Sequence, residues 1–216
     1  MNDSNLRERL VECGQLFHSR GWSVGTSSNY SAVRREDPLE ITITVSGKDK
    51  GKLDVSDFVV VGQDGSPVQG ESQKSSAETM LHVKAVQRLN AKSVLHTHSV
   101  WGTLLSDFFH EEDGFEISGY EMLKGLEGIP DHQSSIWVPI FENTQDIPAL
   151  ADEFENYLAN HPDRKCYGYL IRRHGLYTWG KDVFSARRHI EVFEFLFEVI
   201  ARRMMMTNIP SPIRLA

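Results

Sequence analysis

The stretch SVLHTHSVWG, residues 93–102, carries the strongest structural signal in the chain. Val94 and Leu95 form the apolar lead-in of a short buried strand, and two histidines, His96 and His98, follow with one threonine between them. Side chains at positions i and i+2 of a strand point to the same face of a sheet. The two imidazoles therefore project side by side, at a spacing that lets both bind one metal ion.

The pattern also fits a core histidine that bonds to backbone beside a second histidine that faces solvent. A third ligand would favour the metal site. His174 follows an apolar stretch and precedes Gly175, so it could reach a cleft from the end of another strand. Three neutral imidazoles with an open fourth position are typical of a catalytic zinc site. The sequence leaves three other histidines open as the third ligand: His82, His132 and His189.

Helical and strand patterns alternate along the whole chain, and no linker or repeat divides it. Apolar spacing predicts a first helix that ends near Gly21, and Asp182 is expected to cap a long last helix. The strand that contains Pro139 is expected to lie at a sheet edge or to bend there. We expect one α/β domain over residues 1–216, with a central, mainly antiparallel sheet covered by helices.

Composition narrows the class of protein further. The 216 residues are 40% hydrophobic, enough for a sizeable core, and the net charge of −7 argues against a nucleic-acid surface. Two distant cysteines, Cys13 and Cys166, favour a reduced cytoplasmic protein over a disulfide framework. The charged N-terminus has no signal-peptide core, and no apolar run approaches the roughly 20 residues of a membrane span. We expect a cytoplasmic protein that binds neither nucleic acid nor membrane.

Two glutamates are candidates for acid/base chemistry. Glu78 lies early in a predicted helix, three residues after Ser75, so a capping-box role is the alternative. Glu121 follows Tyr120 in the stretch GYEMLKG. A half-buried glutamate there would have a raised pKa suited to proton transfer, whereas an exposed one would pair with Lys124.

Three short polar stretches could bind an anion. They are TSSN at residues 26–29, SGKDKG at residues 46–51 and KSS at residues 74–76. Small residues let backbone N–H groups approach a phosphate, and serine hydroxyls add further donors. Each stretch alone could equally be a plain turn.

Taken in order, the stretches TSSN, SGKDKG, SSAE, HTH and RRHG resemble the pattern of the class II aldolase/adducin family. The match spans about residues 5 to 203, nearly the whole chain. The resemblance implies a class II aldolase-like three-layer fold, with the sheet between helix layers, in a homotetramer whose active sites lie near subunit interfaces. It also implies one Zn²⁺ per subunit on His96, His98 and His174.

Within this family, SGKDKG, SAETMLH, VLHTHS and GYEMLKG are most similar to zinc-dependent dehydratases of methionine salvage, lyases that remove water from a methylthio-substituted ketose phosphate. The resemblance implies Glu121 as the general acid/base and Glu78 as a helper. Ser28 is a departure, because many relatives have glycine at this position. The phosphate group of the substrate is expected among Ser27, Asn29, Ser46, Gly47, Lys48, Ser75 and Ser76.

Two other functions stay open. A sugar-phosphate aldolase or 4-epimerase would use the same three histidines, so the metal site does not decide between them. The distinction then depends on Glu121 and its neighbours. An adducin-like interaction module would carry the fold without chemistry, and the intact histidine set of HTH and RRHG argues against that class.

Overall fold

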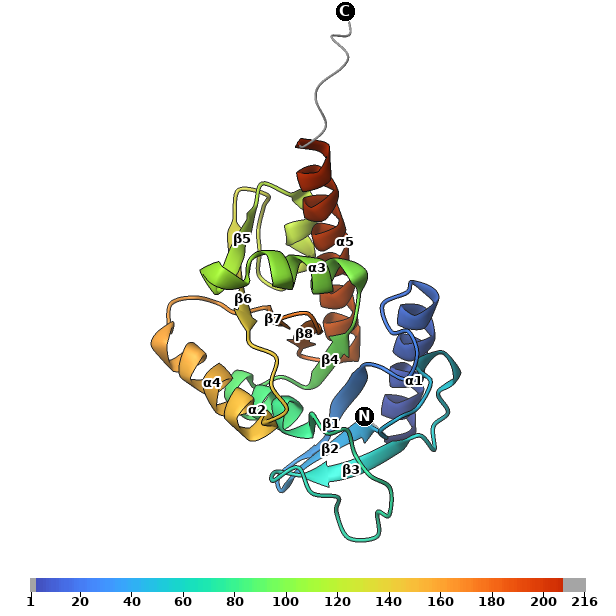
Figure 1. The fold of residues 1–216 in the computed structure, drawn as a ribbon. Coiled ribbons are helices and arrows are strands. Elements are labelled where there is room, and N and C mark those ends of the chain that lie inside the picture. The colour runs from blue at the N-terminus through green and yellow to red at the C-terminus, as the bar shows by residue number, and fades with distance from the viewer. Residues whose placement is uncertain (1–2, 208–216) are drawn as a thin grey trace, which may run out of the picture.

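The computed structural model describes residues 3–207, and its core is one sheet (Figure 1). Its strands are β1 (Asn29–Glu36), β2 (Leu39–Thr44), β3 (Phe58–Gly62), β4 (Ser93–Thr97), β5 (Gly114–Ser118), β6 (Ser135–Phe141), β7 (Gly168–Ile171) and β8 (Gly175–Gly180). They lie in the order β3-β2-β1-β4-β8-β7-β6-β5. Neighbours are antiparallel except β6 and β7, which are parallel. The predicted mainly antiparallel sheet is confirmed.

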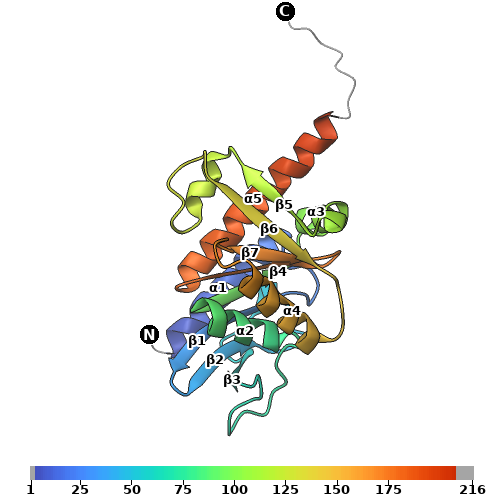
Figure 2. The same cartoon turned by 90° about the vertical axis from the view of Figure 1, so that its left-hand side faces the viewer.

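Helices cover both faces of this sheet, which confirms the expected three layers (Figure 2). They are α1 (Asp3–Ser19), α2 (Thr79–Leu89), α3 (Val100–Phe108), α4 (Ile147–Asn160) and α5 (Val183–Thr207), with 3-10 turns η1 (Lys50–Lys52), η2 (His110–Glu112) and η3 (Glu121–Gly125). Buried side chains of α1, α3 and α5 pack against one face. Those of α2 and α4 pack against the other.

The predicted end of the first helix and the predicted start of the last helix are confirmed. After α1, the N–H of Trp22 donates to the carbonyl of Phe17 at 2.8 Å, and Gly21 has a φ of 77°. Glycine adopts this left-handed conformation without steric cost, so it ends the helix. At the start of α5, the carboxylate of Asp182 accepts the N–H of Ser185 at 2.6 Å.

Of the two alternatives for the strand at Pro139, an edge or a bend, the edge is contradicted. Strand β6 lies inside the sheet, between β5 and β7. Pro139 faces Gly114 at the end of the β5 pairing, and the β7 pairing begins one residue later, at Ile140 opposite Leu170. The missing proline N–H therefore falls where the strand exchanges one partner for the other.

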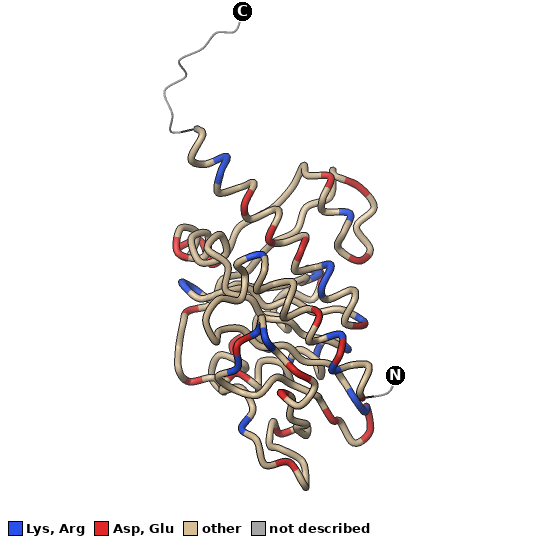
Figure 3. The backbone as a smooth tube through the Cα atoms, turned by 90° about the vertical axis from the view of Figure 1, so that its right-hand side faces the viewer, with Lys and Arg blue, Asp and Glu red and all other residues tan. Residues whose placement is uncertain are grey.

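Charges are interleaved over the surface. Acidic and basic segments alternate along α5 (Figure 3), where Arg187 lies 3.7 Å from Glu191 and Arg202 lies 2.6 Å from Glu198. None of the helices in residues 3–207 is long and apolar enough to cross a membrane.

The two faces of β4 determine where the chemistry can lie. Val94 belongs to the core under α2 and α4, whereas Leu95 belongs to the core under α1 and α5. His96 therefore points to the α2 and α4 side, because it lies two residues after Val94. Asn29 of β1 pairs with it on one side and Tyr177 of β8 on the other.

Ser28, immediately before β1, has a φ of 72°, a conformation that glycine adopts without strain. A side chain in this region costs about 1 kcal/mol or more. We therefore expect Ser28→Gly to raise the free energy of unfolding by about 1 kcal/mol, a few degrees in melting temperature. Calorimetry of the variant beside the wild type measures this effect, and a lower melting temperature would contradict it.

Candidate metal centre and active site

The three predicted histidines converge at one point. The Nε2 atom of His174 lies 3.2 Å from Nε2 of His98 and 3.3 Å from Nε2 of His96. His96 ends β4, His98 follows it, and His174 lies in the turn between β7 and β8. Within residues 3–207 these three side chains form the one cluster of suitable ligand atoms for a metal ion.

The donor geometry fits a tetrahedral metal. Imidazole nitrogens bound at about 2.0–2.1 Å in tetrahedral positions lie about 3.3 Å from one another. The observed Nε2 separations of 3.2 and 3.3 Å match this value. Nδ1 of His96 lies 2.9 Å from the carbonyl of Leu176, so it carries the proton and leaves Nε2 free for a metal.

Neighbouring strands hold the imidazoles in place. The ring of His96 stacks on Tyr177 with centroids 4.0 Å apart. The N–H of His98 donates to the carbonyl of Trp22 at 2.7 Å, which fixes the chain as it leaves β4. Behind them, Thr97 donates its hydroxyl to the buried carboxylate of Glu194 at 2.8 Å.

The site keeps the imidazoles neutral. Burial, with His174 and Lys50 nearby, lowers the pKa of His98 to about 3. Burial also lowers the pKa of His96 well below its usual value, and the other two histidines add to the effect. The pKa of His174 is lowered by burial, against an opposing effect of Glu78. Neutral imidazoles offer the lone pairs that a metal ion needs.

Glu78 lies against the three histidines. Its Oε2 accepts hydrogen bonds from Asn29 Nδ2 at 2.6 Å and from the hydroxyl of Tyr177 at 2.8 Å. Its Oε1 lies 3.3 Å from Nε2 of His174. Two donors on one oxygen fix the orientation of the carboxylate and leave the other oxygen facing the imidazole of His174.

The capping-box alternative for Glu78 is wrong. Helix α2 begins at Thr79, later than the Ser75 start requires, and Glu78 is the N-cap residue without a side-chain cap. Ser75 instead bridges to Val45 in an extended segment. The short helix start leaves the carboxylate of Glu78 free to point at the histidines.

The other candidate histidines have structural partners. Nδ1 of His82 lies 2.8 Å from the hydroxyl of Ser31, and its Nε2 makes a short hydrogen bond to Oδ1 of Asn29. This contact orients the amide of Asn29 so that its NH₂ group faces Glu78. His189 bonds to the carbonyl of Trp179 at 2.7 Å. His132 lies on the surface near Glu121 (Oε2–Nδ1 3.4 Å).

A cavity of about 250 Å³ opens beside the histidines, and Glu78, His98 and His174 lie in its wall. Five residues predicted to bind phosphate line it: Ser27, Asn29, Ser46, Gly47 and Ser76. Lys48 and Ser75 are not among the described residues of its lining. The ammonium of Lys48 pairs with Asp57 at 2.7 Å in this structure.

Sequence reasoning missed several residues of the site. Tyr177, which bonds Glu78, belongs to the strand that follows His174, at the pairing position of His96. Lys50 lies in the stretch SGKDKG and lines the cavity, whereas the sequence pattern predicts Lys48 as the phosphate ligand. The segment 143–145 after β6 also lines the cavity, and its sequence contains no motif that predicts this position.

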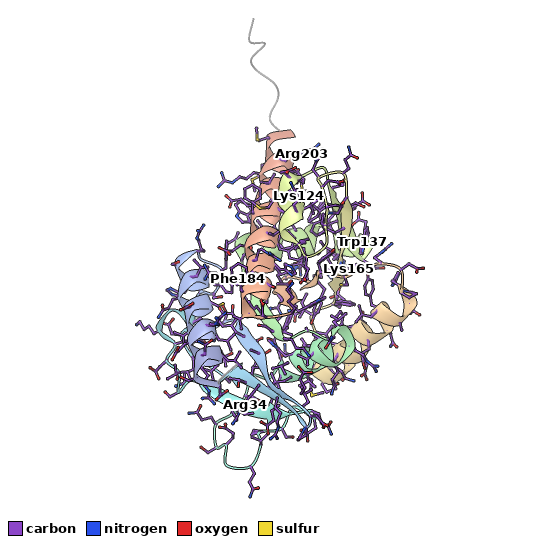
Figure 4. All side chains as sticks on the ribbon, turned by 180° about the vertical axis from the view of Figure 1, so that it is seen from behind. Arg34, Lys124, Trp137, Lys165, Phe184 and Arg203 are labelled. Atoms are coloured by element: carbon purple, nitrogen blue, oxygen red, sulfur yellow. The ribbon has the colours of Figure 1, made fainter. Side chains whose placement is uncertain are left out.

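Glu121 lies elsewhere in this chain. Its side chain is 69% exposed and pairs with Lys124 at 2.8 Å and His132 at 3.4 Å. It begins η3, which packs beside α5, and Figure 4 shows Lys124 there. The hydrogen bond from Lys124 lowers the pKa of Glu121. Of the two alternatives that the sequence left open, the single chain shows the exposed glutamate paired with Lys124.

Comparison with known proteins identifies similar sequences. The sequence profile of the class II aldolase and adducin N-terminal domain matches residues 8–201. A methylthioribulose-1-phosphate dehydratase from Marinobacter nauticus is 48% identical over 192 residues, 88% of this chain and 90% of that protein. One of the same name from Pseudomonas fluorescens is 46% identical over 204 residues, 94% of this chain and 95% of that protein.

Solved structures share the fold at low sequence identity. An L-fuculose 1-phosphate aldolase superposes with a TM-score of 0.75 at 20% identity, covering 98% of this chain and 91% of that one. The L-fuculose-1-phosphate aldolase of Thermus thermophilus gives a TM-score of 0.74 at 19% identity, covering 96% of this chain and all of that one (100%). These likenesses establish the architecture.

Burial lowers the pKa of His82 to about 3, while an unfolded histidine titrates near about 6.5. Below about pH 6.5 the unfolded chain binds a proton that the folded chain excludes, so His82 makes stability fall as pH falls. Relative to His82→Gln, we expect the metal-free wild type to lose about 2 kcal/mol between pH 7.5 and pH 5.0. Urea unfolding of both proteins in EDTA measures the difference. Parallel pH profiles would contradict it.

We expect one divalent metal ion per chain in the wild type and none in His98→Ala, because two imidazoles bind more weakly than three. EDTA should lower the melting temperature of the wild type, since a metal that binds only the folded state stabilises it by mass action. Metal analysis by mass spectrometry, with a melting curve, checks both. His132→Ala is the control and should retain the metal. Retention in His98→Ala would rule out this centre.

Proposed function

Because the chain belongs to the class II aldolase and adducin family, we propose that it is a methylthioribulose-1-phosphate dehydratase. It converts 5-methylthioribulose 1-phosphate to 5-methylthio-2,3-dioxopentyl phosphate and water, a hydro-lyase reaction of methionine salvage. One observation carries the proposal: relatives of this name match nearly the whole chain at 42–48% identity. The histidine cluster and Glu78 supply a site able to perform such chemistry.

The reaction breaks the C3–H and C4–O bonds of the substrate. The proton on C3 is acidic because C3 adjoins the C2 carbonyl, and the hydroxyl on C4 leaves as water. The resulting enol tautomerises to the diketone. A divalent metal held by three neutral imidazoles supplies Lewis acidity toward the substrate oxygens. We assign this metal as zinc, which favours four-coordinate sites of nitrogen donors.

Glu78 and its neighbours would orient the reacting part of the substrate. Asn29 and Tyr177 hold one carboxylate oxygen of Glu78, so its other oxygen is free to accept a hydrogen bond from a substrate hydroxyl. The polar loops of the same cavity would then hold the phosphate at the far end of the short ketose. Fixing both ends of the substrate limits the motions that compete with elimination.

We infer that Glu121 is the general acid/base and that it acts in the cavity of a neighbouring copy. In its own chain this carboxylate is exposed and paired with Lys124, outside the cavity. A homotetramer would bring such a surface residue to another subunit's histidines. In support, Val100, Leu104 and Phe108 recur every fourth residue on α3 and are 65, 47 and 64% exposed. Such a stripe directly after His98 favours coverage by a second copy.

We also propose a cytoplasmic enzyme whose partners are a small sugar phosphate and further copies of itself. The two cysteines, Cys13 and Cys166, are unpaired and buried. Free thiols of this kind are common in proteins of reducing compartments.

With zinc bound, the wild type should release water from 5-methylthioribulose 1-phosphate and form the diketone phosphate. Glu121→Gln should lower kcat by about 10²–10⁴-fold, because it removes a proton-transfer group. Product analysis by mass spectrometry with steady-state kinetics tests both. Glu116→Gln, an exposed glutamate on β5, is the matched control and should keep full activity.

Two outcomes would favour an aldolase instead. One is a three-carbon phosphate fragment, which would show cleavage of the C3–C4 bond, and the other is activity that is lost in Glu78→Gln but kept in Glu121→Gln.

Co-expression of Glu121→Gln with His98→Ala tests whether Glu121 acts in the cavity of a neighbouring copy. Mixed oligomers should regain activity, because an intact Glu121 then meets an intact metal site across the interface. An inactive mixture would place Glu121 in the site of its own chain or outside the reaction.

A further inference from the structure

The side chain of Lys50 is buried in the protein interior. The residue begins η1 and is 1% exposed. Its ammonium donates to the carbonyl of Lys48 at 2.7 Å and lies 3.4 Å from the carbonyl of Thr26. These two acceptors belong to the two polar loops at residues 46–51 and 26–29, so the ammonium ties the loops together.

No carboxylate of residues 3–207 lies within ion-pair distance of the ammonium of Lys50. The nearby carboxylates form ion pairs with other lysines. Lys48 pairs with Asp57 at 2.7 Å, and Lys52 lies 3.9 Å from Asp49. Burial lowers the pKa of Lys50 to about 8, and the more distant charges of Asp49 and Asp57 offset this only in part. A buried cation without a paired anion is costly, and such groups are normally paired or neutralised.

Lys50 also lines the cavity beside the histidines, where an anion could pair with its ammonium. Among the described residues that line it, Lys50 is the one lysine or arginine. Ser27 and Ser46 of the two loops lie in the same wall, with Gly47. The hydroxyl of Ser27 donates to the carbonyl of Val24 at 2.7 Å, which leaves the Lys50 ammonium, the Ser46 hydroxyl and turn backbone as donors for a phosphate monoester.

We propose that Lys50 provides the positive charge that binds the phosphate group of the substrate, in the position that the sequence suggested for Lys48. The inference rests on the proposed function, because it takes the substrate to be a phosphate ester. Two of the three ammonium N–H groups hold the loops, and the third is available to a phosphate oxygen. The phosphate would supply the anion that the fold does not, and the three histidines would hold the metal at the reacting end of the substrate.

The test uses inorganic phosphate as the probe and isothermal titration of the zinc-loaded protein. Lys50→Met should weaken phosphate binding by about 10- to 100-fold, the effect of one charged hydrogen bond. Lys48→Met is the matched control, two residues away and paired with Asp57, and should bind phosphate as the wild type does. Equal affinities of Lys50→Met and the wild type would overturn the proposal.

Melting curves separate a binding role from a structural one. Lys50→Met removes a buried charge together with the hydrogen bonds to two loop carbonyls, so its melting temperature reports the structural part of the role and its phosphate affinity reports binding. Lys50→Gln, which keeps N–H donors for the two loop carbonyls without charge, is the second variant and should lose phosphate affinity as well. A purely structural lysine would lower the melting temperature in both variants and leave the phosphate affinity of the folded protein unchanged, which contradicts the proposal.

The titration does not depend on turnover, so the two proposals can fail separately. If the wild type loses no water from 5-methylthioribulose 1-phosphate but phosphate binding needs Lys50, the dehydratase assignment fails and the phosphate site stands. If the wild type is an active dehydratase, Lys50→Met should raise KM for this substrate far more than it lowers kcat. An unchanged KM with active enzyme would overturn the role of Lys50 alone.

Discussion

The hydrogen bond between Nδ1 of His96 and the carbonyl of Leu176 is the contact on which the site depends. It fixes the tautomer of a fully buried imidazole and turns Nε2 toward His98 and His174. This bond forms because β4 lies between β1 and β8. Pairing with both strands fixes the backbone of His96, so only the rotamer of its side chain is left to be chosen. The antiparallel sheet thus serves as the frame that positions a ligand from β4 beside one from the β7–β8 turn.

Local pattern was enough to predict some of this arrangement. The prediction that His96 and His98 project side by side follows from strand geometry alone, and the structure brings both imidazoles into one cluster. His174 could be ranked above His82 only through the resemblance, because periodicity does not reveal which histidine a distant strand brings close. His82 proved to orient Asn29, a role that needs three elements to be placed in space at once.

The predictions for Lys48 and Glu121 show one physical limit of reasoning from sequence. Lys48 and Lys50 lie two residues apart in one loop, and nothing local distinguishes them. Their roles differ because Asp57, which ends the loop, reaches Lys48 and leaves Lys50 inside. Glu121 shows the same limit between subunits. Its exposed position in one chain does not reveal whether a second copy of the chain would cover it.

Several features that make folding harder lie around one cavity. Neutral buried histidines, a buried ammonium at Lys50 and a left-handed Ser28 each cost stability in the chain by itself. They lie near the ends of β1, β2 and β4, where a metal ion would bind the lone pairs of the neutral imidazoles and an anion would pair with the ammonium of Lys50. Because neither the strain nor the charges improve the core, binding is the physical reason left for them. The deviations from good packing therefore mark the functional site as clearly as the histidines do.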